Sequence, residues 1–436
     1  MTRRFLRDAF FLSVLAAYVV AGTALVPFHG DESTLVYMSR DYGYQVLQGD
    51  WSRVRFDDAW AHPDEQLLRM INGSIAKYTF GFAWHLAGYS LAEVNKFWDW
   101  RRDWNWNVSS GRLPPPGMLL AARIASSLYL AASIVALFVL ARHVGGRPVA
   151  YLSCLYYALN PAVLLNGRRA MMEGAFLLFG VLVVLAGISY VRRPRWSSAM
   201  VLGAVGGLAL AAKHTNLFPM AAIFSACAVF PFFDRLRPMD AARAAGYLVG
   251  AVVAATAAFL ALNPVWWGMN PVSLATAILR DRRNLLTSYA TVYGGYPGWL
   301  DQFTGFFRQA FVVTPQYFEV SRFGPWIADQ IVAYDASPLS GVSLGGSLLG
   351  GLIMLGLVGV GIITFLRSKE IAFPVRYLVG TWAVTIVLST VLLTPLEWQR
   401  YYLPIFPIVA ICSALGLVRL VGWGVAVLSG RLLRAS

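Results

Sequence analysis

Ionisable side chains gather in five short clusters that lie beside long apolar runs of the chain. A carboxylate can take the proton from a hydroxyl group, and Arg or Lys can neutralise an anionic leaving group, so these clusters are candidates for a transfer site. The sharpest is His29-Gly30-Asp31-Glu32, directly after the first apolar run. The others lie at 56–65, 166–173, 207–214 and 397–404.

The composition indicates what kind of scaffold must position these clusters. Of the 436 residues, 58% are hydrophobic and 13% are charged, and the mean hydropathy is +0.57. A soluble domain carries roughly 25% charged residues, so this chain has too little polar surface for water. In lipid, only helices and closed barrels satisfy their own backbone groups. The apolar runs are long and do not alternate, which favours an all-α polytopic membrane protein.

A membrane span needs about 20 mostly apolar residues. By this criterion we predict about ten transmembrane helices. The first is too long for a signal peptide and lacks its cleavage site, so we expect it to be retained. The spans at 149–166 and 198–212 are the shortest. The predicted spans cover 9–27, 118–142, 149–166, 171–191, 198–212, 216–233, 244–262, 343–366, 374–394 and 402–423.

Basic residues alternate between the loops, as the positive-inside rule expects. With a cytoplasmic N-terminus, every predicted interior segment is short and basic, from the Arg3–Arg7 segment to the C-terminal one with Arg431 and Arg434. The short exterior loops carry few cations. This asymmetry accounts for much of the net charge of +14 without nucleic acid. It predicts cytoplasmic N- and C-termini and places all five ionisable clusters at the extracytoplasmic face of a multi-pass protein, with the plasma or inner membrane expected.

Two long outer loops, about 28–116 and 263–342, are rich in Trp, Tyr, Gly and Pro. Neither has the pattern of an independent soluble domain, so residues 1–436 are expected to form a single domain. The stretch from about 66 to 91 carries a rough apolar stripe and predicts a juxtamembrane helix along the membrane surface. The three cysteines lie within apolar runs and are expected to be buried hydrophobic residues.

The ordered clusters resemble motifs of the GT-C glycosyltransferases, specifically the branch of protein O-mannosyltransferases and aminoarabinose transferases. Asp31-Glu32 matches the acidic pair after the first helix, and the stretch from His62-Pro63 to Gly81 resembles the family's His-Pro-Pro segment with its helix. The remaining correspondences are Arg168 to Glu173, Gly207 to Lys213, and Arg400-Tyr401 to Pro404. Here Asp64 replaces the second proline, and no large exterior domain follows the last span.

The resemblance implies transfer of a sugar from a polyprenyl-phosphate-linked donor to a protein, lipid or glycan acceptor. Such a transfer needs one base and several cations, which makes an inverting displacement the economical scheme. We assign Asp31 as the catalytic base and expect Glu32, Asp58 and His62 to bind the acceptor or support Asp31. The donor phosphate is expected to bind Arg168 or Arg169, Lys213 and Arg400.

Each assignment has a structural alternative. Arg169 and Glu173 stand four residues apart and could simply pair on a helix. Lys213 could be a cation extending to the membrane surface, Arg400 could anchor the membrane interface, and His62 could shape a turn before Pro63. Carboxylates and a phosphate can together hold a divalent cation. We predict no metal ligands in the protein itself, because no Asp-x-Asp lies near Asp31 and no His or Cys has ligand spacing.

Three other functions remain open at this point. A transporter or flippase for a lipid-linked sugar would carry polar residues at mid-membrane depth and broken helices in related halves. A polymerase or ligase for lipid-linked oligosaccharides would use the same class of donor. A non-catalytic assembly subunit would keep the fold but lose its acids, and the presence of Asp31 argues against it.

Overall fold

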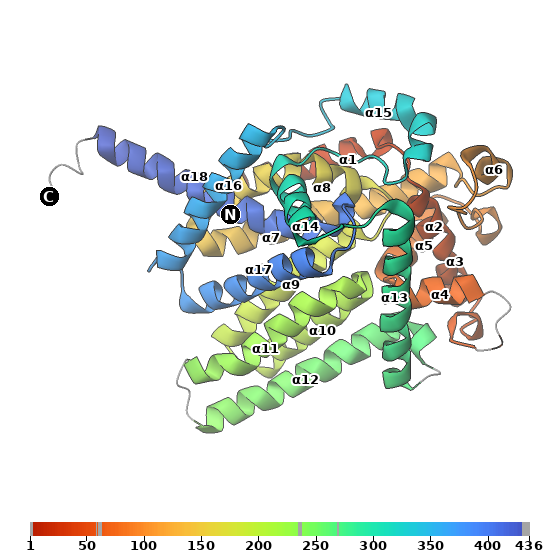
Figure 1. Ribbon diagram of the computed structural model, residues 1–436. Coiled ribbons are helices and arrows are strands. Elements are labelled where there is room, and N and C mark those ends of the chain that lie inside the picture. Colours follow the sequence, from red (N-terminus) through yellow and green to blue (C-terminus); the bar gives the residue numbers. More distant parts are fainter. Residues whose placement is uncertain (1–2, 58, 60–62, 234–237, 268–269, 430–436) are drawn as a thin grey trace.

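The computed structural model describes residues 3–57, 59, 63–233, 238–267 and 270–429. These residues form helices joined by loops, and no strand is assigned among them. Figure 1 shows a bundle of long helices whose outer loops collect at one end, on the right of the view. The long helices of the bundle are α1 (Arg3–Ala21), α7 (Pro116–Leu159), α9 (Glu173–Arg192), α10 (Trp196–Ala212), α11 (Leu217–Phe233), α12 (Pro238–Leu262), α16 (Leu348–Arg367), α17 (Phe373–Leu393) and α18 (Phe406–Leu428).

Within the described residues, eight helices are long and apolar enough to cross a membrane. One of them is α7, which contains non-helical backbone at Gly145 and Gly146. α10 is apolar but shorter, with 17 residues. These findings confirm an all-α polytopic membrane protein. The figure of ten crossings stays a prediction.

α7 reverses its direction at Gly145 and Gly146, where Gly146 adopts a φ of 71° that favours glycine. The two halves of α7 then lie side by side. Two contacts between them show this: the Cys154 thiol donates to the Ile134 carbonyl at 3.4 Å, and the centroids of the Phe138 and Tyr151 rings are 5.5 Å apart. This agrees with the predicted separation of spans 118–142 and 149–166. The second span is nevertheless interrupted at Asn160, where α7 ends and the short α8 (Pro161–Arg168) begins.

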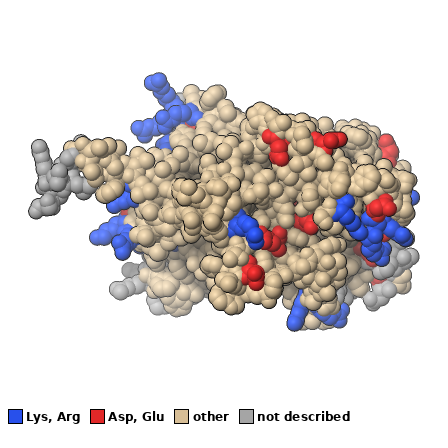
Figure 2. Space-filling model, turned by 45° about the horizontal axis from the view of Figure 1, so that its top comes forward, with Lys and Arg blue, Asp and Glu red and all other residues tan. Residues whose placement is uncertain are grey.

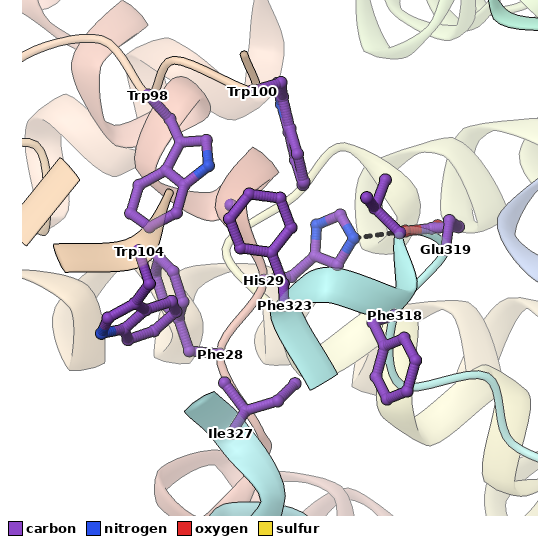
Figure 3. A pocket seen from close by; sticks show the side chains of 11 residues that line it. Phe28, His29, Trp98, Trp100, Trp104, Phe318, Glu319, Phe323 and Ile327 are labelled. Atoms are coloured by element: carbon purple, nitrogen blue, oxygen red, sulfur yellow. Dashed lines mark hydrogen bonds and ion pairs between the residues drawn. The ribbon is translucent and has the colours of Figure 1, made fainter. Parts of the chain in front are cut away.

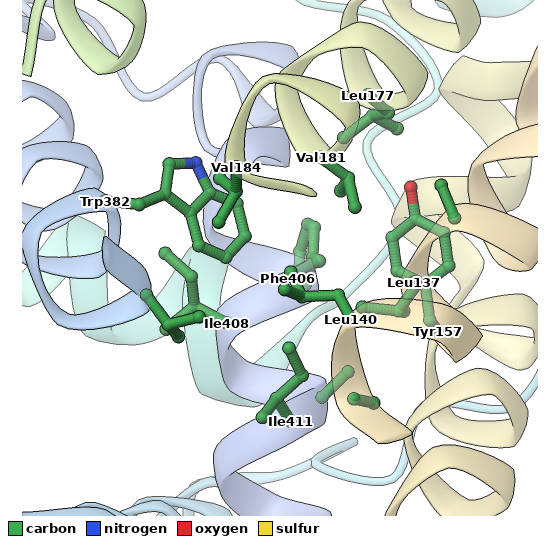
Figure 4. Close-up of a cluster of buried hydrophobic side chains, with 14 of the residues drawn as sticks. Leu137, Leu140, Tyr157, Leu177, Val181, Val184, Trp382, Phe406, Ile408 and Ile411 are labelled. Atoms are coloured by element: carbon green, nitrogen blue, oxygen red, sulfur yellow. The ribbon is translucent and has the colours of Figure 1, made fainter. Parts of the chain in front are cut away.

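The core lies where α7, α9, α17 and α18 meet. Figure 4 shows Phe406 of α18 among the α7 and α9 side chains Leu140, Val181 and Val184, with Trp382 of α17 beside Val184. Phe406 is fully buried there. Since lipid is as apolar as these side chains, close packing rather than exclusion of water fixes how the helices fit together.

Besides shorter helical turns, the described part of the first outer loop holds five α-helices. They are α2 (Gly30–Met38), α3 (Arg40–Tyr42), α4 (Pro63–Ile71), α5 (Ile75–Leu86) and α6 (Trp104–Ser109). The prediction of one continuous helix over 66–91 was wrong, because two helices, α4 and α5, separated at residues 72–74, occupy this stretch. α5 packs inward on one face, where Phe80 and Trp84 are fully buried, whereas Phe82 and Leu86 are exposed.

The break between α4 and α5 has a local cause at Gly73. A Cβ atom on Gly73 would lie 2.1 Å from the carbonyl oxygen of Ala212, at the end of α10. The Ser74 N–H donates to the Ala211 carbonyl at 2.6 Å. The chain therefore leaves its helix here to pack backbone against backbone on α10.

The second outer loop holds α13 (Pro271–Tyr293), α14 (Trp299–Phe307) and α15 (Ala328–Asp335). The two outer loops pack on each other through one apolar cluster, in which Phe28 and Trp98 of the first loop meet Phe323 and Ile327 of the second. Figure 2 shows Lys and Arg at both ends of the face in view, whereas Asp and Glu lie over its centre and right.

Candidate active site

Asp31 lies in the first turn of α2, and the residue before that helix fixes its backbone. The Asp31 N–H donates to His29 Nδ1 at 3.1 Å, and the His29 N–H donates to Glu32 Oε2 at 3.0 Å. This reciprocal cap satisfies two N–H groups that a helix start otherwise leaves without partners. The side chain of Asp31 keeps 22% of its surface exposed, so its carboxylate is accessible.

Arg400 pairs with Asp31 although 369 residues separate them in the chain. Its Nη1 donates to Asp31 Oδ2, and its Nε lies 3.4 Å from Glu319 Oε1. The guanidinium also lies over the Trp398 ring, 4.9 Å from its centroid. The two predicted residues Asp31 and Arg400 therefore meet in one site.

The segment that carries Arg400 is held against the second outer loop by Gln399. This buried side chain donates to the Thr314 carbonyl at 2.8 Å, and the Gln399 N–H donates to Gln316 Oε1 at 2.7 Å. Arg308 and Glu397 add an ion pair at 2.6 Å between the same two segments. These contacts bring Arg400 beside Glu319.

Glu319 and His29 are site residues to which the sequence analysis gave no role. His29 Nδ1 already accepts the Asp31 N–H, so its proton lies on Nε2, which donates to Glu319 Oε2 at 2.5 Å. Burial lowers the pKa of His29 despite the neighbouring carboxylate. Burial alone would raise the pKa of Glu319, but His29 and Arg169 hold it below its usual range. The cluster His29–Glu32 was a signal for the histidine, whereas Glu319 stands in an aromatic-rich loop without any motif.

Aromatic rings enclose the His29 imidazole. Figure 3 shows it facing Glu319, with Phe323 beside it and the indoles of Trp98 and Trp100 on one side. The Trp100 ring centroid lies 5.5 Å from that of His29. These side chains line a small opening next to Asp31. The polar groups of the site are therefore held in largely apolar surroundings, where electrostatic interactions are strong.

Glu32 points away from this opening and into the protein. It is fully buried and pairs with Arg123 of α7 through two hydrogen bonds of 2.7 Å each. The Ala170 N–H donates to the same carboxylate at 2.8 Å. Burial would raise the pKa of Glu32, but Arg123 holds it below the ordinary value. Arg123 was not among the predicted site residues, although a lone Arg early in an apolar run is a recognisable signal.

Arg168 and Arg169 are both buried, and they donate mainly to backbone carbonyls. Arg168 donates to Val19 O and Tyr18 O, each at 2.8 Å, and to the Tyr334 hydroxyl at 2.9 Å. Arg169 donates to Pro27 O at 3.1 Å and Tyr317 O at 2.6 Å. Arg168 thus ties α8 to α1. Arg169 lies near the Asp31 site, where its charge acts on both Glu32 and Glu319.

Lys213 follows α10 and donates to Glu173 Oε1 at 2.8 Å. Its Nζ lies 5.2 Å from the centroid of the Phe176 ring. Glu173 therefore pairs with Lys213, and the alternative of a pair with Arg169 is not found. The second Glu173 oxygen is buried without a partner among the described residues. Asp58 and His62, the other two predicted site residues, lie outside the described residues.

A second charged cluster lies in the first outer loop. Asp41 accepts from Arg69 Nε at 2.9 Å and from Lys77 Nζ at 2.5 Å, and all three residues are buried. This cluster joins α3, α4 and α5. Among the described residues, no three His, Cys, Asp or Glu side chains gather as a metal ion would require.

With this geometry established, comparisons identify the fold. Residues 118–267 match the family model described as dolichyl-phosphate-mannose-protein mannosyltransferase. The matched residues make up less than half of the chain. The structure is similar to ArnT from Cupriavidus metallidurans in the apo state (TM-score 0.52, 14% identity, 100% of this chain and 64% of that chain). It is also similar to the same protein bound to undecaprenyl phosphate (TM-score 0.50, 14% identity, 98% and 63%).

A third similar structure is the archaeal oligosaccharyltransferase AglB from Archaeoglobus fulgidus, in complex with an inhibitory peptide and a dolichol-phosphate (TM-score 0.51, 13% identity, 99% of this chain and 52% of that chain). No curated protein matches the sequence. The chain spans less than two thirds of the length of each of these solved chains. Together with the family match, these similarities show that the chain has the GT-C fold of the mannosyltransferase and ArnT type, which confirms the resemblance seen in the sequence motifs.

Proposed function

We propose that the protein is a glycosyltransferase that takes a sugar from a polyprenyl-phosphate-linked donor and transfers it to an acceptor at the extracytoplasmic face. The main supporting observation is the contact between Asp31 and Arg400, which joins a partly exposed carboxylate to a guanidinium at the end of the bundle where the outer loops meet. The match to the mannosyltransferase model and the lipid phosphate in the ArnT structure support this class of donor.

In this proposal Asp31 is the general base. It takes the proton of the acceptor hydroxyl, whose oxygen bonds to the anomeric carbon of the sugar as the bond from that carbon to the phosphate oxygen breaks. Polyprenyl phosphate leaves with the electron pair of that bond. One carboxylate is enough for such a displacement, which inverts the anomeric centre.

Under this scheme Arg400 pairs first with Asp31 and then with the donor phosphate. Before donor binding it neutralises Asp31, and when the donor phosphate arrives the guanidinium turns to it, because Arg matches phosphate oxygens with several N–H donors. The exchange frees Asp31 to accept a proton. Glu319 keeps Arg400 near the site, because its Oε1 lies 3.4 Å from Arg400 Nε.

The remaining predicted residues are assigned by their contacts. Glu32 supports Asp31 by anchoring α2 to Arg123, and Lys213 is proposed as a further phosphate ligand that keeps Glu173 on one of its three N–H donors. Arg169 contributes positive charge beside the site, whereas Arg168 is assigned to holding α8 against α1. Asp58 and His62 are kept as proposed acceptor-binding residues. The basic interior segments support cytoplasmic termini and an extracytoplasmic site.

The test is to incubate the purified protein with a panel of polyprenyl-phosphate sugars and a membrane extract that supplies acceptors, and to measure release of polyprenyl phosphate. We expect release with at least one donor and a loss of about 100-fold or more in Asp31→Asn. Asp301→Asn, which changes an exposed acid of α14, is the matched control and should retain activity. Full activity of folded Asp31→Asn would refute the base assignment. Absence of release with every donor would favour a transporter.

A further inference from the structure

A groove of about 690 Å³ lies at the opposite end of the bundle from Asp31, between α1 and the second half of α7. Arg7, Phe10 and Val14 of α1 line one side, and Arg147 and Tyr151 of α7 line the other. The three residues of α1 are spaced at i, i+3 and i+7, so they follow one face of the helix. Nothing in the proposed transfer reaction uses this groove.

One end of the groove is positively charged. Arg147 is paired with the buried Asp8 at 2.9 Å, so these two charges offset each other. Arg7 is exposed and donates from Nε to the Tyr151 hydroxyl at 3.2 Å, which is its one hydrogen bond among the described residues. A guanidinium has five N–H donors, so Arg7 keeps several for a ligand. Arg142, whose charge also acts on Asp8, adds further positive charge.

The rest of the groove is apolar and continues along α1. Phe10 is 72% exposed and Val14 is 50% exposed, and both stand on the membrane-crossing part of the helix. From Arg7 to Val14 the helix rises about 10 Å, at 1.5 Å per residue. A cationic end that leads into an apolar track fits a molecule with an anionic head and a hydrocarbon tail.

We propose that this groove binds an anionic phospholipid from the membrane leaflet at the basic end of the bundle. The lipid phosphate accepts hydrogen bonds from Arg7, with Arg142 contributing charge, and an acyl chain lies along Phe10 and Val14. A free phosphate ion would gain nothing from the apolar track. A zwitterionic lipid would bring its own cation to a site that already carries excess positive charge. This site is independent of the proposed transfer activity.

The test compares lipid retention in purified protein reconstituted with equal amounts of phosphatidylglycerol and phosphatidylcholine. Native mass spectrometry counts the lipids that remain bound. Wild type should retain phosphatidylglycerol preferentially, and Arg7→Gln should weaken this preference about 5-fold, since one basic residue near a membrane surface contributes about 1 kcal/mol toward anionic lipid. Arg367→Gln changes an exposed arginine at the last residue of α16 that does not line the groove, and as the matched control it should weaken the preference less than Arg7→Gln does.

Two further measurements separate the alternatives. Phe10→Ala should weaken retention of long-chain phosphatidylglycerol more than of a short-chain form, because it shortens the apolar track. Equal retention by wild type and Arg7→Gln would overturn the proposal. So would displacement of the lipid by millimolar inorganic phosphate, which would identify the groove as a site for a free anion. Neither outcome depends on activity, so failure here is distinguishable from failure of the transferase assignment.

Discussion

The buried pair of Glu32 and Arg123 allows a quantitative test of what Glu32 does. The pair is bidentate at 2.7 Å, and neither side chain is exposed by more than 7%. Removing one partner of such a pair leaves an uncompensated buried charge, which costs about 3–5 kcal/mol. We therefore expect Glu32→Gln to lower the free energy of unfolding by about that amount, even though the amide oxygen can still accept the Ala170 N–H.

A double-mutant cycle separates pairing from other effects. Arg123→Met alone leaves Glu32 charged and unpaired, so it should cost about as much as Glu32→Gln. The double variant leaves no buried charge in this pair, so its loss should be no larger than that of either single variant. The expected coupling energy is about 3 kcal/mol, at the upper end for residues in contact. Denaturation of the purified variants in a graded series of denaturing detergent measures these losses, with Glu370→Gln as an exposed control.

The same variants decide whether Glu32 supports Asp31 or binds the acceptor. If its role is to anchor α2, the double variant should recover transfer activity per folded molecule relative to Glu32→Gln. Additive destabilisation in the cycle would refute the view that the pair acts as a unit. Recovered stability without recovered activity would instead assign Glu32 to the acceptor.

Two further predictions concern pH and packing. Because burial lowers the pKa of His29 from its ordinary value of 6.5, the unfolded chain binds more protons just below pH 6.5 than the folded one. The free energy of unfolding should therefore fall as the pH drops through this range. In thermal unfolding, His29→Asn should flatten this dependence of stability on pH. An unchanged dependence would contradict the view that His29 stays neutral in the folded protein. Gly73→Ala places a methyl group against the Ala212 carbonyl and should lower the free energy of unfolding by about 1–3 kcal/mol in the same detergent titration. Gly356→Ala is the control and should cost little, because a Cβ atom there meets nothing within 4 Å. Equal losses in the two variants would argue against the close approach at Gly73.

The sequence predicted the features that arise from local composition. Apolar runs gave the membrane helices, and the short break at 143–148 marked the reversal of α7. The clusters at Asp31 and Arg400 were found because acids and bases stand out beside apolar segments. These signals are local, since helix length and hydropathy depend on neighbouring residues alone.

The long-range partners could not be predicted in the same way. Glu319 lies 290 residues from His29, and nothing in its neighbourhood indicates which residue it contacts. The break at Gly73 depends on the end of α10, about 140 residues away, so the apolar stripe over 66–91 predicted one continuous helix. Arg168 and Lys213 carry the charge expected of phosphate ligands, but whether a cation is free or already paired depends on packing between distant segments.

The pairing of these cations bears on how a donor would bind. Arg168 gives its N–H groups to fixed backbone carbonyls, and withdrawing a buried guanidinium from them would leave acceptors unsatisfied at a cost of about 1–3 kcal/mol each. Arg400 is different, because its partner Asp31 is partly exposed, so water can solvate the carboxylate once the arginine leaves. A phosphate can therefore compete for Arg400 at low cost, and the same exchange exposes the proposed base. On this argument, donor binding and activation of Asp31 are one event, and the pair must open before a proton can be accepted.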